Sequence, residues 1–159
     1  MPENPLPNQP GWAAHAAPDS PGRALATALG AGAVLTLVWG LVSGLTGRHY
    51  LALLPVIGAA LAVALTSTPA RRVWFPLVAF VLGFAVGYLG DIAAVALLLW
   101  RHGYAATLIL GHLPQVAGAV NDGHSAGDWG YFLASGALAA VTTAARHKAR
   151  PAAAERPSR

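Results

Sequence analysis

The sequence predicts an all-α integral membrane protein: a helical bundle of four transmembrane helices, with an interfacial or re-entrant segment before the last. Two observations lead to this fold class. The chain of 159 residues is 55% hydrophobic and only 10% charged, whereas a soluble domain carries about 25% charged residues. The apolar residues also come in long blocks without any charged side chain, which is typical of membrane spans rather than of a soluble core.

The first two spans are predicted from uncharged blocks near the N-terminus. Residues 1–23 are rich in proline and show no periodic pattern, so we expect a disordered tail. The first span is predicted at about 24–47 and the second at about 50–68. Pro55 falls in the first turns of the second span, where its missing N–H costs least. A helix of roughly 20 residues crosses a hydrocarbon core of about 30 Å, so both blocks are long enough.

The third and fourth spans are less regular. The third is predicted at about 73–100, an apolar run that Asp91 alone interrupts. The fourth is predicted at about 129–145, where 17 residues are close to the lower limit for a span. Residues 101–128 include His, Pro and Gln among their apolar residues, so we expect an outer loop with an interfacial or re-entrant segment. A fifth span over 104–120 remains an alternative.

The positive charges predict the orientation of the bundle. Nine arginines and one lysine are present, and five of these ten cations lie in residues 146–159, which we expect to be a basic disordered tail. Four spans with both termini inside place eight cations in the cytoplasm and two outside, as the positive-inside rule requires. The alternative with five spans gives seven against three. We therefore expect a multi-pass protein of the bacterial inner membrane with both termini in the cytoplasm.

Asp91 is the candidate functional residue inside a predicted span. A carboxylate at mid-depth costs at least about 2.5 kcal/mol on insertion scales, so it must face the bundle, pair with another group or stay protonated. In one interpretation Asp91 is a proton or cation relay or a ligand contact. In the other, which we favour, the helix ends near Gly90, a poor helix residue, and Asp91 caps a following helix at the water surface.

Several His and Asp residues of the predicted outer loop are candidate metal ligands. They are His102, His112, Asp122, His124 and Asp128. Imidazole and carboxylate groups suit zinc and similar ions, and in an extended strand Asp122 and His124 would share one face. Against a metal site, no H-E-x-x-H spacing occurs, and N-D-G-H-S-A-G is also an ordinary solvated turn.

Two pairs of glycines four residues apart predict close helix packing. Gly40 and Gly44 lie in the first predicted span, and Gly83 and Gly87 lie in the third. Such a pair leaves a flat stripe on one helix face, and a second helix can approach closely there. The pattern does not decide whether that second helix belongs to this chain or to a partner.

One resemblance supports the four-span arrangement. The segments LVWGLVSGLTGRHYLALLPVIGAALAVAL and RRVWFPLVAFVLGFAVGYL resemble the small uncharacterised four-span membrane proteins of bacteria. In those proteins a glycine-rich first hairpin is followed by a short basic cytoplasmic loop and a third span. The similarity covers roughly residues 24–100, and it implies a fold but no activity.

Three classes of function follow from these features. The favoured class is a non-enzymatic accessory or assembly subunit that packs against a membrane protein partner or a second copy through its glycine faces. The second is a small transporter or channel subunit with Asp91 in the path, and the third is a metal-dependent membrane enzyme that uses the outer His and Asp residues. Cysteine, a P-loop and a G-x-G-x-x-G motif are all absent. We therefore expect no cofactor and no nucleic acid partner, and the expected surroundings are the lipid bilayer.

Overall fold

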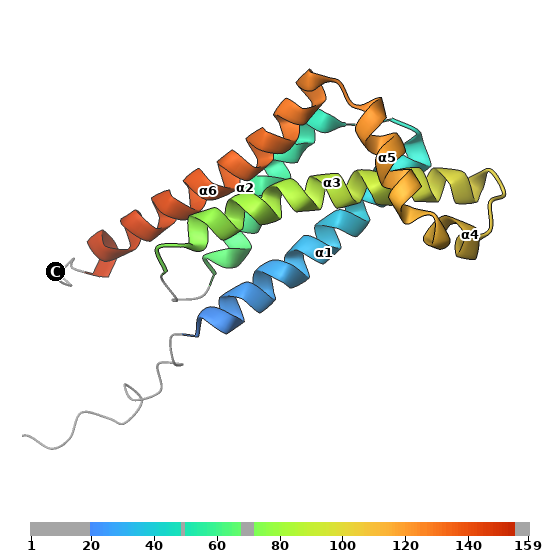
Figure 1. Ribbon diagram of the computed structural model, residues 1–159. Helices are drawn as coiled ribbons and strands as arrows, with labels where there is room; N and C mark the ends of the chain where they lie inside the picture. The colour runs from blue at the N-terminus through green and yellow to red at the C-terminus, as the bar shows by residue number, and fades with distance from the viewer. Residues whose placement is uncertain (1–19, 49, 68–71, 155–159) are drawn as a thin grey trace, which may run out of the picture.

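The computed structural model describes residues 20–48, 50–67 and 72–154. Every regular element in this part of the chain is a helix (Figure 1), which confirms the all-α prediction. Nearly all of the predicted N-terminal tail, residue 68 of the second predicted span and the last residues of the predicted C-terminal tail lie outside the described residues.

Four helices make up the bundle. They are α1 (Pro21–Thr46), α2 (Leu54–Leu65), α3 (Phe75–Arg101) and α6 (Ala126–Ala154). A turn of 3-10 helix, η2 (Leu51–Leu53), leads into α2, and two short helices, α4 (Ala106–Gly111) and α5 (Leu113–Gly123), connect α3 to α6. Figure 1 shows the start of α1 and the end of α6 at one end of the bundle, here called the termini end. Helices α4 and α5 lie at the opposite end, here called the α5 end.

The sequence around α1 explains where this helix begins and ends. The Ser20 side chain accepts a hydrogen bond from the backbone N–H of Arg23 at 3.4 Å, and Pro21 occupies the first helical position, as helix starts favour. Gly47 adopts a left-handed conformation with φ 63° and its N–H donates to the Ser43 carbonyl oxygen, which is a common way to end a helix.

The four predicted transmembrane helices are not supported as such. Among the described residues, α1 and α3 are the two helices that are long and apolar enough to cross a membrane. Helix α2 has only 12 residues, about 18 Å at 1.5 Å per residue, which is shorter than a hydrocarbon core of about 30 Å. Helix α6 has 29 residues, but its apolar stretch also contains glycine, serine and threonine, which lower its mean hydropathy.

The structure gives the helices of the predicted outer segment and corrects the predicted C-terminal tail. Residues 101–128 form α4 and α5 over most of their length, because apolar side chains at helical spacing, such as Ile109 and Val116, are buried against the bundle. Helix α6 continues to Ala154, so the tail predicted from residue 146 is helical over its first part. The run from 146 to 149 contains two cations but no helix-breaking residue.

The outer surface of the bundle is strongly apolar. Large apolar side chains such as Leu37, Val81 and Val141 are 61%, 56% and 65% exposed. Exposed apolar surface on this scale is unusual for a soluble monomer. It accords with a membrane protein, as do the two membrane-capable helices.

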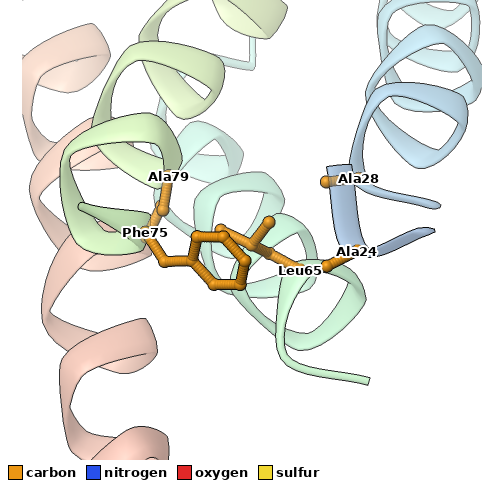
Figure 2. Close-up of a cluster of buried hydrophobic side chains, with 6 residues drawn as sticks. Ala24, Ala28, Leu65, Phe75 and Ala79 are labelled. Atoms are coloured by element: carbon orange, nitrogen blue, oxygen red, sulfur yellow. The ribbon is translucent and has the colours of Figure 1, made fainter. Parts of the chain in front are cut away.

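Small residues pack the termini end of the bundle. Figure 2 shows Phe75 and Leu65 beside the alanines of α1 and α3. The buried cluster consists of Ala24, Ala28, Leu65, Phe75, Ala79 and Ala139. Because four of these six residues are alanines, the helices approach closely and a single phenyl ring fills the remaining space.

Both predicted glycine pairs pack inside the chain. A Cβ added at Gly40 would lie 2.8 Å from Cβ of Ala93 on α3, and one at Gly44 would lie 2.9 Å from the Ala94 carbonyl oxygen. On the other side of α3, a Cβ at Gly83 would lie 3.0 Å from the carbonyl oxygen of residue 135 on α6. One at Gly87 would similarly meet a ring of α6 at 2.9 Å. The glycine pair of α3 therefore faces α6, whereas the glycine pair of α1 faces α3.

The closest approach involves glycines that the sequence analysis did not single out. We call the residues Gly58, Gly83, Ser135 and Gly136 the small-residue contact, where α2, α3 and α6 meet. A Cβ at Gly58 would overlap the Ser135 carbonyl oxygen, and one at Gly136 would lie 2.7 Å from the Phe80 carbonyl oxygen. The Ser135 hydroxyl donates to the Gly83 carbonyl oxygen at 3.0 Å. The signal was Gly58 with a small residue four positions later, a looser form of the glycine motif.

Candidate functional site

Asp91 lies in the interior of the bundle and not at a helix end. Helix α3 runs without a break through Gly90 and Asp91, and the Asp91 side chain is completely buried. The favoured interpretation of Asp91 as a cap at the water surface is therefore wrong. Gly90 serves packing, because a Cβ at that position would overlap the indole ring of Trp39.

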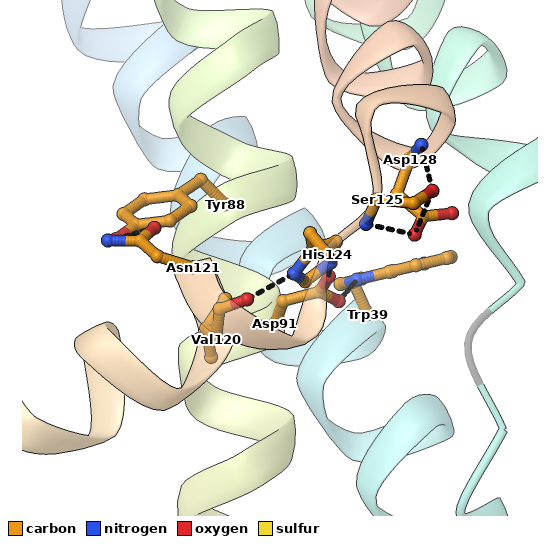
Figure 3. A network of polar contacts seen from close by, with 8 residues as sticks. All are labelled: Trp39, Tyr88, Asp91, Val120, Asn121, His124, Ser125 and Asp128. Atoms are coloured by element: carbon orange, nitrogen blue, oxygen red, sulfur yellow. Dashed lines mark hydrogen bonds and ion pairs between the residues drawn. The ribbon is translucent and has the colours of Figure 1, made fainter.

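Each carboxylate oxygen of Asp91 has a hydrogen-bond partner from another helix. The indole Nε1–H of Trp39 on α1 donates to Oδ1 at 2.7 Å. His124, at the end of α5, places Nε2 2.9 Å from Oδ2. Figure 3 shows the three side chains converging from α1, α3 and α5. We call Trp39, Asp91 and His124 the Asp91 network.

The hydrogen bonds of His124 indicate where the protons of the Asp91–His124 pair lie. His124 Nδ1 contacts the Val120 carbonyl oxygen, which is only an acceptor, so Nδ1 carries a hydrogen. The contact between Nε2 and Oδ2 then needs one more proton, on either the imidazole or the carboxyl group. In both cases the pair has no net charge, which removes most of the cost of burying Asp91.

The histidines of the predicted metal site are helix C-caps. His102 ends α3, His112 ends α4 and His124 ends α5. Each ring contacts through Nδ1 the carbonyl oxygen four residues earlier, which belongs to Leu98, Leu108 and Val120 respectively. Carbonyl groups in the last turn of a helix need such partners, and the Leu98 carbonyl oxygen also accepts the backbone N–H of His102.

The structure does not bring the predicted metal ligands together. Asp122 is exposed, and Asp128 accepts hydrogen bonds from the backbone N–H and hydroxyl of Ser125 at 2.8 and 2.9 Å. Ser125 and Asp128 thus cap the start of α6 reciprocally. Within the described ranges, no group of three or more His, Cys, Asp or Glu side chains lies close enough to hold a metal ion.

A cavity adjoins the Asp91 network. Its volume is about 450 Å³, and both His124 and Asp128 line it. On the other side of the imidazole, the rings of Trp129 and Phe132 lie with centroids 5.9 and 5.3 Å from that of His124. His124 therefore stands between a buried carboxylate, an aromatic wall and a cavity, with its side chain 9% exposed.

Sequence analysis missed Trp39 as a member of this site. The signal was present, because Trp39 lies in the middle of the first predicted span, where an indole N–H needs a buried acceptor. Asp91 is the one acidic residue inside a predicted span, so a hydrogen bond between Trp39 and Asp91 could have been predicted.

The comparisons with known proteins add no relative. The chain matches no protein-family model, no curated protein and no solved structure. The resemblance to small four-span membrane proteins of bacteria therefore stays a prediction.

Proposed function

We propose that this protein is a non-enzymatic integral membrane protein that takes up and releases a proton at Asp91 and His124, as a small transporter or channel subunit. One observation carries the proposal. The carboxylate of Asp91 is fully buried, and Oδ2 lies 2.9 Å from Nε2 of the His124 imidazole, which also lines a cavity. Ionisable residues inside membrane bundles are expensive, and they commonly mark ion and proton pathways.

The proposed membrane arrangement is a bundle of α1, α2, α3 and α6 in the bacterial inner membrane. Helices α1 and α3 have the length and composition of spans, and a short span such as α2 is accommodated by local thinning of the bilayer. Arg23, Arg72, Arg146 and Lys148 belong to the termini end, whereas Arg48 and Arg101 belong to the α5 end. This asymmetry favours a cytoplasmic termini end.

Proton exchange at the pair changes its charge by one unit. With one proton between them Asp91 and His124 are neutral, with a second they carry +1, and without it they carry −1. Asp128 lines the adjoining cavity, and Tyr88 lies on α3 one turn from Asp91.

Two observations weigh against the other classes of function. The glycine pairs face helices of the same chain, so they offer no free surface to a second protein. The candidate metal ligands are engaged in separate helix caps. The transporter or channel class is the one that uses the buried Asp91 network.

Proton flux through reconstituted vesicles tests the proposal. The purified protein is placed in liposomes that contain a pH-sensitive dye, and a pH gradient is applied. In the Asp91→Asn variant the amide oxygen still accepts from Trp39 and the amide N–H₂ still donates to His124 Nε2. The fold is therefore kept, but the side chain no longer takes up or releases a proton. We expect flux from the wild type and none above empty liposomes from this variant.

Histidine variants provide the matched control. His124→Gln should lose flux, whereas His102→Gln alters the same kind of helix cap outside the Asp91 network and should keep it. Flux that is equal in wild type and Asp91→Asn would remove the pair from the function. A wild-type flux no greater than that of empty liposomes would reject the proposed class.

A further inference from the structure

One face of α5 covers two adjoining cavities at the α5 end of the bundle. His112, Gln115, Val116 and Ala119 line a cavity of about 380 Å³. Ala119, Val120, Gly123 and His124 line the cavity of about 450 Å³ beside the Asp91 network. Their spacing of three and four residues places them on a single helix face, and Val95 of α3 lines both cavities.

The smaller cavity, here called the α5 groove, has an apolar floor and a polar mouth. Its apolar lining comes from α3, α4 and α5, namely Val95, Leu99, Leu108, Ile109, Val116 and Ala119. Ile109 and Val116 are only 7% and 6% exposed and form the deepest part. The polar residues that line it, Tyr104, His112 and Gln115, are all exposed, and no acidic side chain lines it.

The surroundings of the α5 groove are also apolar. Leu110 on α4 and Leu113 on α5, the two short helices that line it, are 65% and 39% exposed. In the proposed membrane arrangement this surface lies at the outer edge of the bilayer, so a hydrocarbon chain enters the groove directly from lipid.

We infer that the α5 groove binds one acyl chain of a membrane phospholipid, with the headgroup at its mouth. The apolar floor matches a hydrocarbon chain. Tyr104 and Gln115 supply hydrogen-bond donors for ester and phosphate oxygens, and the absence of a lining carboxylate suits an anionic headgroup. The inference rests on the membrane location of the proposed function.

Lipid in the α5 groove is coupled to the Asp91 network through α5. The same helix supplies the groove with Val116 and Ala119 and holds His124 against Asp91. A ligand that binds only when α5 is docked stabilises the docked state. Bound phospholipid therefore favours the hydrogen bond between His124 and Asp91.

Native mass spectrometry of the protein extracted in mild detergent tests the inference. The wild type is supplied with dioleoylphosphatidylglycerol, and the mass of any bound molecule identifies its source. Ala119→Phe fills the junction of the two cavities, and because Ala119 is exposed the new ring needs no rearrangement of the core. We expect one phospholipid on the wild type and about tenfold weaker retention in this variant, equivalent to about 1.4 kcal/mol.

Val141→Phe is the matched control, since Val141 is 65% exposed on α6 and should retain phospholipid as the wild type does. Leu108→Ser is a second groove variant at a half-exposed position, with equal thermal stability as the check on folding. No adduct on the wild type, an adduct with the mass of fatty acid or detergent, or equal loss from Val141→Phe would overturn the inference. Flux that persists without bound lipid would reject the coupling of the groove to the Asp91 network. Selective lipid binding with unchanged flux in Asp91→Asn would reject the proposed proton function alone.

Discussion

The small-residue contact and the Asp91 network hold neighbouring helices together by different physical means. At the first, Gly58 and Gly136 bring the backbones of α2, α3 and α6 within van der Waals distance. At the second, α5 meets α3 through the His124–Asp91 hydrogen bond and a few buried apolar side chains such as Val116 and Val120. Close backbone packing holds the first contact together, whereas the second combines apolar packing with hydrogen bonds between polar side chains.

We therefore expect the contact of α2, α3 and α6 to be rigid and the contact between α5 and α3 to open more readily. Close packing is not continuously deformable, so α2, α3 and α6 are expected to keep one arrangement. A buried polar pair is stable only while its proton count is right, because a broken pair leaves uncompensated polar groups in the interior. The following predictions test whether the two contacts respond differently.

The largest effect is expected from Gly58→Ala. Its new methyl group would overlap the Ser135 carbonyl oxygen, so the backbones of α2 and α6 must separate. Overpacking of this kind costs about 3 kcal/mol. Denaturant unfolding in detergent micelles, followed by circular dichroism, measures the loss.

Gly30→Ala on α1 is the control for this substitution. Nothing lies within 4 Å of a Cβ at Gly30, so the variant should gain up to about 1 kcal/mol from helix propensity. If both alanine variants behave alike, the small-residue contact is not what holds α2 to α6.

A smaller effect is expected from Asp91→Leu. The leucine removes the acceptor of the Trp39 indole N–H and the partner of His124, which costs about 2 kcal/mol. Asp91→Asn keeps a partner for both groups and should lose much less. Unfolding together with hydrogen exchange of the α5 amides distinguishes the two variants.

Equal destabilisation by leucine and asparagine would contradict the proton count, because the amide replaces both hydrogen bonds of the one-proton pair. In that case the charge of Asp91, rather than its hydrogen bonds, would stabilise the docked α5.

Local patterns in the sequence predicted a good part of this fold. Uncharged blocks predicted α1 and α3 to within a few residues, and the glycine pairs predicted close packing. Helix α2 came out shorter than predicted, because its apolar block extends beyond the residues that form a helix. Composition indicates which residues avoid water, but it does not indicate how many of them belong to one helix.

The candidate site was harder to predict because its members come from distant segments. Trp39 and Asp91 are 52 positions apart, and Asp91 and His124 are 33 apart. From the local sequence, Gly90 next to Asp91 indicated a helix end, yet the glycine is there to admit the Trp39 ring. The histidines indicated a metal site, yet each caps a helix. Both errors arose because local rules do not include tertiary partners.

A moderate effect is expected from Ser125→Ala. The variant removes the hydroxyl that donates to Asp128 at 2.9 Å and accepts from its backbone N–H at 3.3 Å. Loss of such a cap costs about 1 kcal/mol. Hydrogen exchange should rise in the first turn of α6 and remain unchanged at the small-residue contact. Increased exchange around Ser135 as well would mean that the start of α6 and the small-residue contact unfold together.

The smallest effect is expected from Tyr88→Phe. The Tyr88 hydroxyl donates to the Asn121 side chain at 3.1 Å in an exposed position, and water replaces an exposed partner at little cost, about 0.5 kcal/mol. Hydrogen exchange of α5 should therefore change far less than in Asp91→Leu, although both variants lose a side-chain contact between α3 and α5. Undocking of α5 to the same extent in both variants would show that the exposed bond matters as much as the buried one. The shared proton would then not be what holds α5 to the bundle.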